Sequence, residues 1–176
     1  ASQRAAALVL TAAMLTTLTA PAFAGTWYIE DGDITVKAGE TKGTNKVSQG
    51  ENPEEEDTGT IITNRNKDNA SSHTVTIEAE DKDDKVEVTL KDVNIDASSR
   101  GEAAVSVTGK GDTNIELNGD NELKSGADHA GLEHNKTRTS GELTIQDKDK
   151  NGSLTATGGE YGAGIGGSIG NAGQVT

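Results

Sequence analysis

The densest cluster of metal-ligand residue types in this sequence runs from Asp147 to Gly152, which reads Asp-Lys-Asp-Lys-Asn-Gly. Carboxylate and amide oxygens at alternate positions can converge on one cation, and a glycine allows the sharp turn of a calcium loop. The twelfth position, where such a loop carries a bidentate glutamate, is Gly158. We therefore interpret the segment as a solvated corner loop, and weak calcium binding by Asp147, Asp149 and Asn151 is the alternative.

Other chemistry-bearing motifs are incomplete. Gly162, Gly164 and Gly167 form a formal G-x-G-x-x-G, but a turn rich in Gly and Asn follows in place of the helix that would hold a pyrophosphate. The three histidines, which we expect at the surface, have no catalytic or zinc spacing: His73, His129 and His134. The chain has no Cys, which excludes thiol catalysis and thiolate metal sites. We predict no catalytic residue and no cofactor beyond the calcium alternative.

Short extended segments must position any functional residue, because hydrophobic residues recur in dyads spaced i, i+2, which share one face of a strand. Three dyads follow one another and the set then repeats. The three sets are Val88/Leu90, Val93/Ile95 and Val105/Val107, then Ile115/Leu117, Asn121/Leu123 and Ala130/Leu132, then Leu143/Ile145, Leu154/Ala156 and Ala163/Ile165. A new set begins at Val175. The pattern predicts an all-β fold, a right-handed single-stranded parallel β-helix of about four turns with three short strands per turn.

Residues 25–58 are expected to cap the N-terminal end of this solenoid. Strands at 26–29 and 34–36 flank a turn, and Trp27 with Tyr28 should plug the core, since an uncapped end leaves apolar surface and strand edges in water. We expect residues 39–58 to form a long acidic surface loop. The β-helix should then occupy residues 59–176 and be truncated at its C-terminus, because the last residues lie inside a strand pattern.

Residues 1–24 predict a signal peptide. Arg4 precedes an apolar run, and Ala22-Phe23-Ala24 supplies a small-residue cleavage site, so we expect cleavage after Ala24. The protein should be extracellular, secreted or associated with the cell wall. We expect no membrane insertion, because no later segment is long and apolar enough. The chain has 29 Asp and Glu and a formal charge of −13, which argues against nucleic acid as a partner because that binding requires clustered cations.

Side chains that point outward between dyad members are the candidates for ligand contact. We name Glu116, Thr144 and Thr155, with Tyr161 as the only late aromatic, as carbohydrate-binding residues. The leading hypothesis is a non-catalytic module that binds an extended polysaccharide along one flat sheet face. A structural stalk or spacer in a larger adhesin is the first alternative, and a polysaccharide lyase or hydrolase is the second. The sequence leaves the oligomeric state open.

Parts of the chain resemble a known protein family. The segments Val88 to Ile95 and Ala104 to Val107, and above all Leu154 to Gly159 followed by Gly162 to Gly167, resemble the β-helical surface proteins of Firmicutes described as carbohydrate-binding domain-containing. The resemblance covers residues 59–176. It implies a pectate-lyase-like scaffold in a secreted or wall-associated protein that binds plant or host polysaccharide, with no assigned reaction. It transfers no individual binding residue to this chain.

Overall fold

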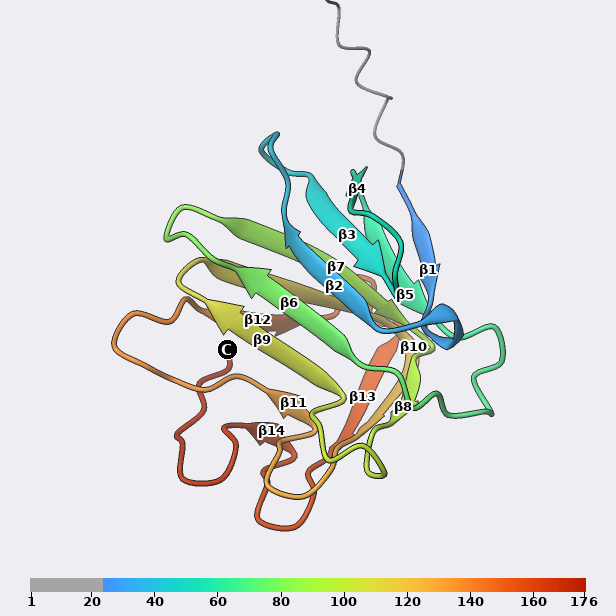
Figure 1. Ribbon diagram of the computed structural model, residues 1–176, viewed down its shortest axis with the longest axis vertical. Coiled ribbons are helices and arrows are strands. Elements are labelled where there is room, and N and C mark those ends of the chain that lie inside the picture. Colours follow the sequence, from blue (N-terminus) through green and yellow to red (C-terminus); the bar gives the residue numbers. More distant parts are fainter. Residues whose placement is uncertain (1–23) are drawn as a thin grey trace, which may run out of the picture.

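The structure is a computed structural model that describes residues 24–176, and in this range the chain forms a β-solenoid (Figure 1). The predicted signal peptide lies, apart from Ala24, outside the described residues. One 3-10 turn, η1, spans Ile29–Asp31. The strands are β1 (Thr26–Tyr28), β2 (Ile34–Ala38), β3 (Asn45–Gln49), β4 (Glu55–Asp57), β5 (Thr60–Thr63), β6 (Val75–Ala79), β7 (Lys85–Lys91), β8 (Asn94–Asp96), β9 (Val105–Gly109), β10 (Asp112–Lys124), β11 (Leu132–Glu133), β12 (Leu143–Gln146), β13 (Gly152–Thr157) and β14 (Ile165–Gly166).

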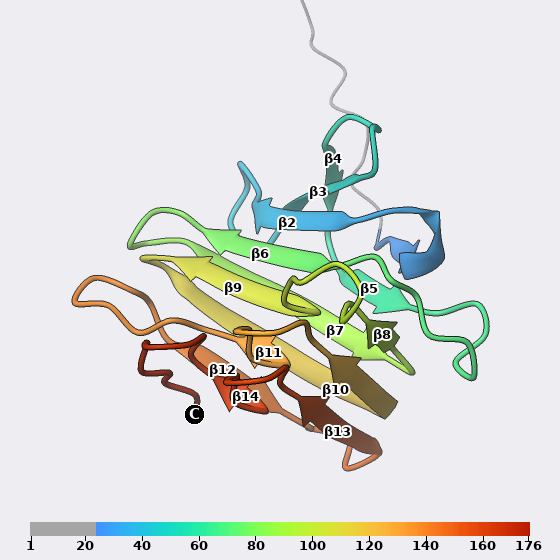
Figure 2. The same ribbon diagram turned by 60° about the horizontal axis from the view of Figure 1, so that its bottom comes forward.

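Successive turns stack three parallel sheets around one axis. We call them the β7 face (β1, β5, β7, the first half of β10, and β12), the β13 face (β8, the second half of β10, and β13) and the β9 face (β2, β6, β9, β11 and β14). Figure 2 shows β2, β6 and β9 lying one above another. The five strands of the β7 face correspond to about four turns between β1 and β12, which confirms the predicted parallel solenoid.

Most of the predicted dyads stack in the expected register, but two steps are shifted. Val88 and Leu90 lie beside Ile115 and Leu117, as predicted. By contrast, Leu132 lies beside Val105 where the pattern predicts Val107, and Ile145 lies beside Ile115 where it predicts Leu117. A shift of two residues keeps every side chain on the same face. The dyad pattern therefore predicts the facing of these strands correctly and their pairing incorrectly.

The inward side chains form one continuous aliphatic core. It includes Ile62, Leu90, Ile115, Leu123 and Leu132, all fully buried. In the last turn, inward residues such as Leu154 are only partly buried. The backbone of Thr176 hydrogen-bonds to Leu143 and Ile145, so the chain begins a further turn here, as the pattern at Val175 predicts.

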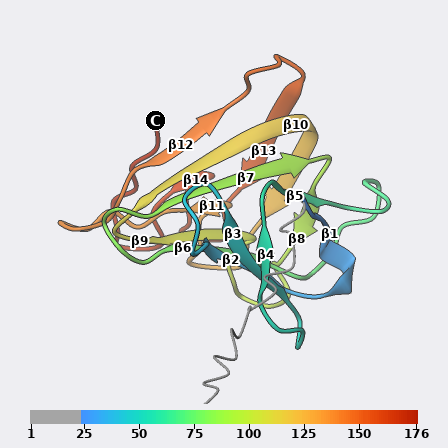
Figure 3. The ribbon, with the colours of Figure 1, turned by 90° about the horizontal axis from the view of Figure 1, so that it is seen from above.

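Residues 39–58 do not form the long surface loop expected from the sequence. They contain β3 and β4, which pair antiparallel to each other, and β3 also pairs antiparallel with β2. Figure 3 views this end of the solenoid and shows β2, β3 and β4 lying across it. Val47 is 0 % exposed and belongs to the core. The cap therefore consists of β2, the first strand of the β9 face, and of β3 and β4, which extend that face with antiparallel pairing.

Strand β3 of the cap was missed because its inward residues are mostly polar. Asn45 and Gln49 flank Val47 on β3, and both are buried. The Asn45 side-chain amide donates to the Glu87 carbonyl at 2.7 Å, and that of Gln49 donates to the Tyr28 carbonyl at 2.6 Å. Buried amides are tolerated when they satisfy backbone carbonyls in this way. A pattern of hydrophobic residues alone cannot reveal such a strand.

Candidate functional site

The outer surface of the β7 face carries side chains in rows that run across the strands. Because neighbouring strands are parallel and in register, one row contains Ile61, Thr89, Glu116 and Gln146, and the next contains Glu87, Asn114 and Thr144. Adjacent members of a row are separated by about 4.8 Å, the spacing of strands in a sheet. The face thus presents hydrogen-bonding side chains at regular intervals from β7 to β12, and Ile61 is the apolar member of its row on β5.

These rows form the floor of an open groove of about 600 Å³. The β2–β3 turn, with Lys42 and Gly43, borders the groove near the cap. The loop after β12, with Lys148 and Asp149, borders it at the other end. The groove therefore extends over four strands and is lined by hydrogen-bonding side chains of both donor and acceptor type.

Glu116 occupies a special position in this groove. Its Oε1 accepts a hydrogen bond from the Lys148 backbone N–H at 2.7 Å, which ties the bordering loop to β10. Its Oε2 is buried and has no hydrogen-bond partner among residues 24–176. A buried carboxylate oxygen normally has a partner. One oxygen of Glu116 therefore holds the bordering loop against β10, while the other is covered and has no partner among the described residues.

A scan of protein-family models and searches of curated proteins and solved structures each find no match. The function of this chain must therefore be inferred from the geometry of its own surface. Within residues 24–176, no helix is long and apolar enough to cross a membrane.

The four candidate carbohydrate-binding residues do not share one face, contrary to the sequence hypothesis. Glu116 lines the groove and Thr144 lies beside Asn114 in the adjacent row. Thr155 lies on the β13 face, in a second groove of about 380 Å³ with Asn94 and Glu122. Tyr161 is 73 % exposed in the turn before β14. The structure thus brings together only the first two candidates.

The reason is the corner inside β10. Gly119, with a φ of 63°, lets the strand pass from the β7 face to the β13 face without an interruption in pairing. Outward residues before and after this glycine therefore point in different directions. The sequence pattern contains the glycine but does not show whether it marks a turn, a bulge or a corner.

The structure gives the calcium hypothesis no support. The two oxygens of Asp147 accept backbone hydrogen bonds from Asn151 and Gly152, each at 3.1 Å, so this carboxylate closes its own loop. Asp149 and Asn151 are exposed. No group of three His, Cys, Asp or Glu residues within the described range could hold a metal ion. The favoured interpretation of the sequence, a solvated corner loop, agrees with these contacts.

The expectation that all three histidines lie at the surface is wrong. His134 is only 2 % exposed, and its ring nitrogens lie 3.2 Å from the Val107 carbonyl oxygen and 3.0 Å from that of Gly141. It points inward because it lies two residues after the inward-facing Leu132, and the shifted register places it at the level of Val107. His129 is half-buried against the carboxylate of Glu133, at 2.9 Å.

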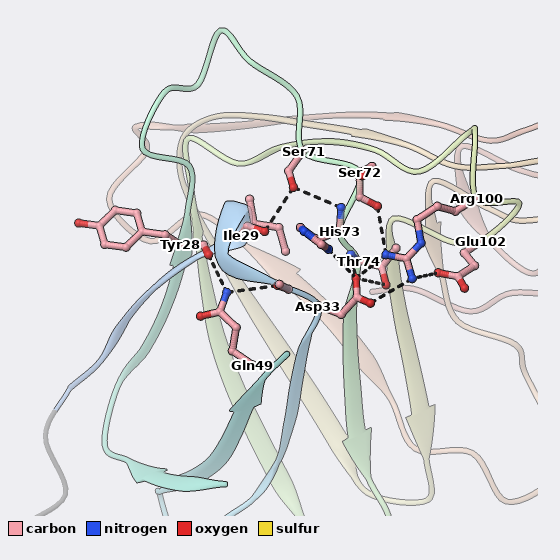
Figure 4. A network of polar contacts seen from close by, with 11 residues as sticks. Tyr28, Ile29, Asp33, Gln49, Ser71, Ser72, His73, Thr74, Arg100 and Glu102 are labelled. Atoms are coloured by element: carbon pink, nitrogen blue, oxygen red, sulfur yellow. Dashed lines mark hydrogen bonds and ion pairs between the residues drawn. The ribbon is translucent and has the colours of Figure 1, made fainter. Parts of the chain in front are cut away.

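A polar network at the corner between the β13 and β9 faces was also missed (Figure 4). The Arg100 guanidinium donates to both oxygens of Asp33, at 2.6 and 3.0 Å, and contacts Glu102 at 2.9 Å. The Thr74 backbone N–H donates to Asp33 at 2.8 Å. Asp33 follows η1 and Arg100 precedes β9, so the network joins the first turn to the third. No local sequence signal indicates this pairing.

A second Arg–Asp pair lies nearby. Arg65 donates to both oxygens of Asp31, and its guanidinium stacks over the ring of Tyr28 at 4.4 Å. The hydrogen bonds from Arg65 lower the pKa of Asp31. Partial burial by itself raises the pKa of Asp33, but hydrogen bonds from Arg100 and Thr74 outweigh it, so the pKa of Asp33 is also lowered. Both carboxylates are therefore held in their charged form.

These pairs predict a loss of stability in acid. A carboxylate whose pKa is lower in the folded chain stabilises the fold above its unfolded pKa, about 3.9 for Asp, and this contribution disappears as the pH falls through the folded value. We expect the midpoint temperature of thermal unfolding to be steady between about pH 5 and 7 and to fall below about pH 4. The Arg100→Gln variant should lower this midpoint at pH 7 and flatten its acid decline.

Circular dichroism melts from pH 2 to 8 measure both effects. Arg138→Gln is the matched control, because Arg138 is exposed and makes no ion pair within the described residues. An acid decline that is equally steep in wild type and the Arg100→Gln variant would show that Asp33 does not contribute to it.

Proposed function

We propose that this chain is a non-catalytic, extracellular module that binds an extended polysaccharide in the groove of the β7 face. The observation that carries the proposal is the groove itself, whose polar side chains recur from strand to strand. A polymer with a repeating unit can meet similar groups at each step along such a surface. The volume of the groove lies within the range of about 300–1,000 Å³ that is typical of ligand pockets.

The groove offers the partners that sugar hydroxyls need. A hydroxyl both donates and accepts, so the carboxylate of Glu116, which lines the groove, can accept from it, and the amide groups of Asn114 and Gln146 can do either. Lys85 and Lys148 add donors at its edges. Ile61 contributes an apolar surface against which the C–H groups of a sugar ring can pack. The groove contains no aromatic side chain, so hydrogen bonding must supply most of its selectivity.

The Glu116→Gln variant is expected to bind polysaccharide about tenfold more weakly, because a hydrogen bond to a charged group contributes about 1.5–3 kcal/mol and a neutral amide recovers only part of it. Titration calorimetry against a panel of soluble neutral and acidic polysaccharides measures the change. The control is Glu122→Gln, which alters the same strand on the β13 face. Equal losses in both variants would contradict a site in the groove.

The same panel separates the alternatives. A stalk or spacer domain should bind none of the polysaccharides. A lyase or hydrolase should release unsaturated or reducing sugars during incubation with the glycan that it binds. Either outcome would replace the proposed function.

A further inference from the structure

The carboxylate of Asp57, at the end of β4, is buried with only 1 % of the residue exposed. Its Oδ1 accepts from the backbone N–H of Gly25 at 2.8 Å and from that of Gly59 at 2.9 Å. Its Oδ2 accepts from the indole N–H of Trp27 at 2.7 Å. These three donors satisfy its hydrogen-bonding capacity well, but all of them are neutral.

Asp57 has no counter-ion within residues 24–176. The charged groups on the adjoining strands make their contacts elsewhere. Lys46 of β3 pairs with Glu40, and Glu56 of β4 accepts from Thr44 and from the Glu40 backbone N–H. Burying a carboxylate without a compensating positive charge is costly, and buried charges in proteins are usually paired. The carboxylate of Asp57 therefore has no positively charged partner among these residues.

The missing cation can come from the chain itself. Gly25 directly follows the predicted cleavage site at Ala24. Removal of the leader would convert the Gly25 amide nitrogen, which lies 2.8 Å from Oδ1 of Asp57, into a charged α-ammonium group. We propose that this new N-terminus is the counter-ion of Asp57, so that proteolytic processing after Ala24 creates a buried ion pair that locks the N-terminal cap.

The surroundings of Gly25 fit this role. Its carbonyl accepts from the Ile61 backbone N–H at 3.0 Å, which fixes the residue against β5. A Cβ at this position would lie 2.7 Å from the indole nitrogen of Trp27 and 2.8 Å from Oδ2 of Asp57. Only glycine can therefore place its nitrogen at the carboxylate without displacing the two groups that hold it.

The ion pair would join the cap to the β7 face. Asp57 belongs to β4, Gly25 directly precedes β1, Trp27 lies in β1, and Gly59 leads into β5. In the precursor these segments are held by neutral hydrogen bonds only. The mature chain adds a charge-assisted bond at a partly buried site, and such bonds are stronger than those between neutral groups. The cap thus reaches its full stability only after processing.

The expected pH dependence follows from linkage. An α-amino group ordinarily has a pKa of about 7.7–8.0, and pairing with a buried carboxylate raises it in the folded chain. Its stabilising contribution is then complete below the unfolded pKa and disappears as the pH rises through the folded pKa. This alkaline loss is distinct from the acid loss expected for Asp31 and Asp33.

The test compares three proteins: the chain that begins at Gly25, the same chain with the Gly25 amine acetylated, and a chain that begins at Ala22. At pH 7, the free-amine protein should unfold about 5–10 °C above the other two, since breaking a buried pair usually costs several kcal/mol. The gap should close as the pH rises above about 10. Trp27, the only tryptophan, reports on the cap through its fluorescence.

In an Asp57→Asn background, acetylation should have no further effect on the midpoint. Because this substitution can weaken the cap by itself, the pH series on the unsubstituted chain provides an independent test. Equal midpoints for the free and acetylated proteins at pH 7 would overturn the proposal. A different first residue in the exported protein, determined by mass spectrometry, would overturn it as well.

Discussion

The Gly109→Ala variant is expected to lose about 4 kcal/mol or more of its unfolding free energy. Gly109 ends β9 with a φ of 105°, a conformation that residues with a side chain rarely adopt. A Cβ here would lie 1.9 Å from the carbonyl oxygen of Ala79 and 2.4 Å from its carbonyl carbon, on the preceding turn. That carbonyl accepts from the Gly111 N–H at 2.9 Å, so it cannot move away without breaking a bond between turns.

Chemical denaturation of both proteins measures the difference, and Gly101→Ala is the matched control. Gly101 also has a positive φ, of 66°, but a Cβ there would meet nothing within 4 Å. Its replacement should cost only the conformational penalty of about 1–2 kcal/mol. Similar losses in the two variants would mean that the close stacking of turns at this corner does not limit stability.

The parallel solenoid could be predicted because spacing alone determines which way a strand residue points. Dyads such as Val88 and Leu90 place two apolar side chains on one face, and the repeat of three dyads requires three such faces around a core. The spacing of hydrophobic residues did not determine which residues of neighbouring turns pair with each other. Leu132 could pair with Val105 or Val107 without changing face, and the loop that precedes it sets which of the two occurs.

The polar residues of the interior could not be predicted from hydrophobic spacing. Three of them point inward: Asn45 and Gln49 in the cap, and His134 next to β11. The side-chain nitrogens of all three lie within hydrogen-bonding distance of backbone carbonyl oxygens. Those carbonyls belong to other turns and are distant in sequence. Each of these residues resembles a surface residue until the three-dimensional position of its partner is known.

The candidate site, too, could be predicted from the sequence only in part. The outward positions of Glu116 and Thr144 followed from alternation along a strand, and both are at the groove or beside it. The separation of Thr155 from them depends on a corner within one continuous strand. The unpaired oxygen of Glu116 depends on which backbone N–H the other oxygen accepts from, and that contact crosses from one turn to the next.

The Asn121→Leu variant is expected to lose about 3–5 kcal/mol of unfolding free energy, although leucine would match the hydrophobic pattern better. Asn121 is 2 % exposed on β10, just after the corner. Its Oδ1 accepts from the Val93 N–H at 2.9 Å, and its amide donates to the Ser153 carbonyl at 3.1 Å. Leucine would leave the buried N–H of Val93, on the turn before, and the partly buried carbonyl of Ser153, on the turn after, without this partner.

Urea unfolding of Asn121→Leu and Asn118→Leu tests this reasoning. The Asn118 side chain makes no hydrogen bond within the described residues, so its replacement should change stability by less than about 1 kcal/mol. A third variant, Asn121→Asp, keeps an acceptor for Val93 but lacks a donor for Ser153 at neutral pH. Acid protonates its carboxyl group and restores a donor, so this variant should regain part of its lost stability at the pH where the unaltered chain becomes less stable. If the stability of the Asn121→Asp variant fell in parallel with that of the unaltered chain as the pH was lowered, the role of Asn121 as a bridge between turns would be contradicted.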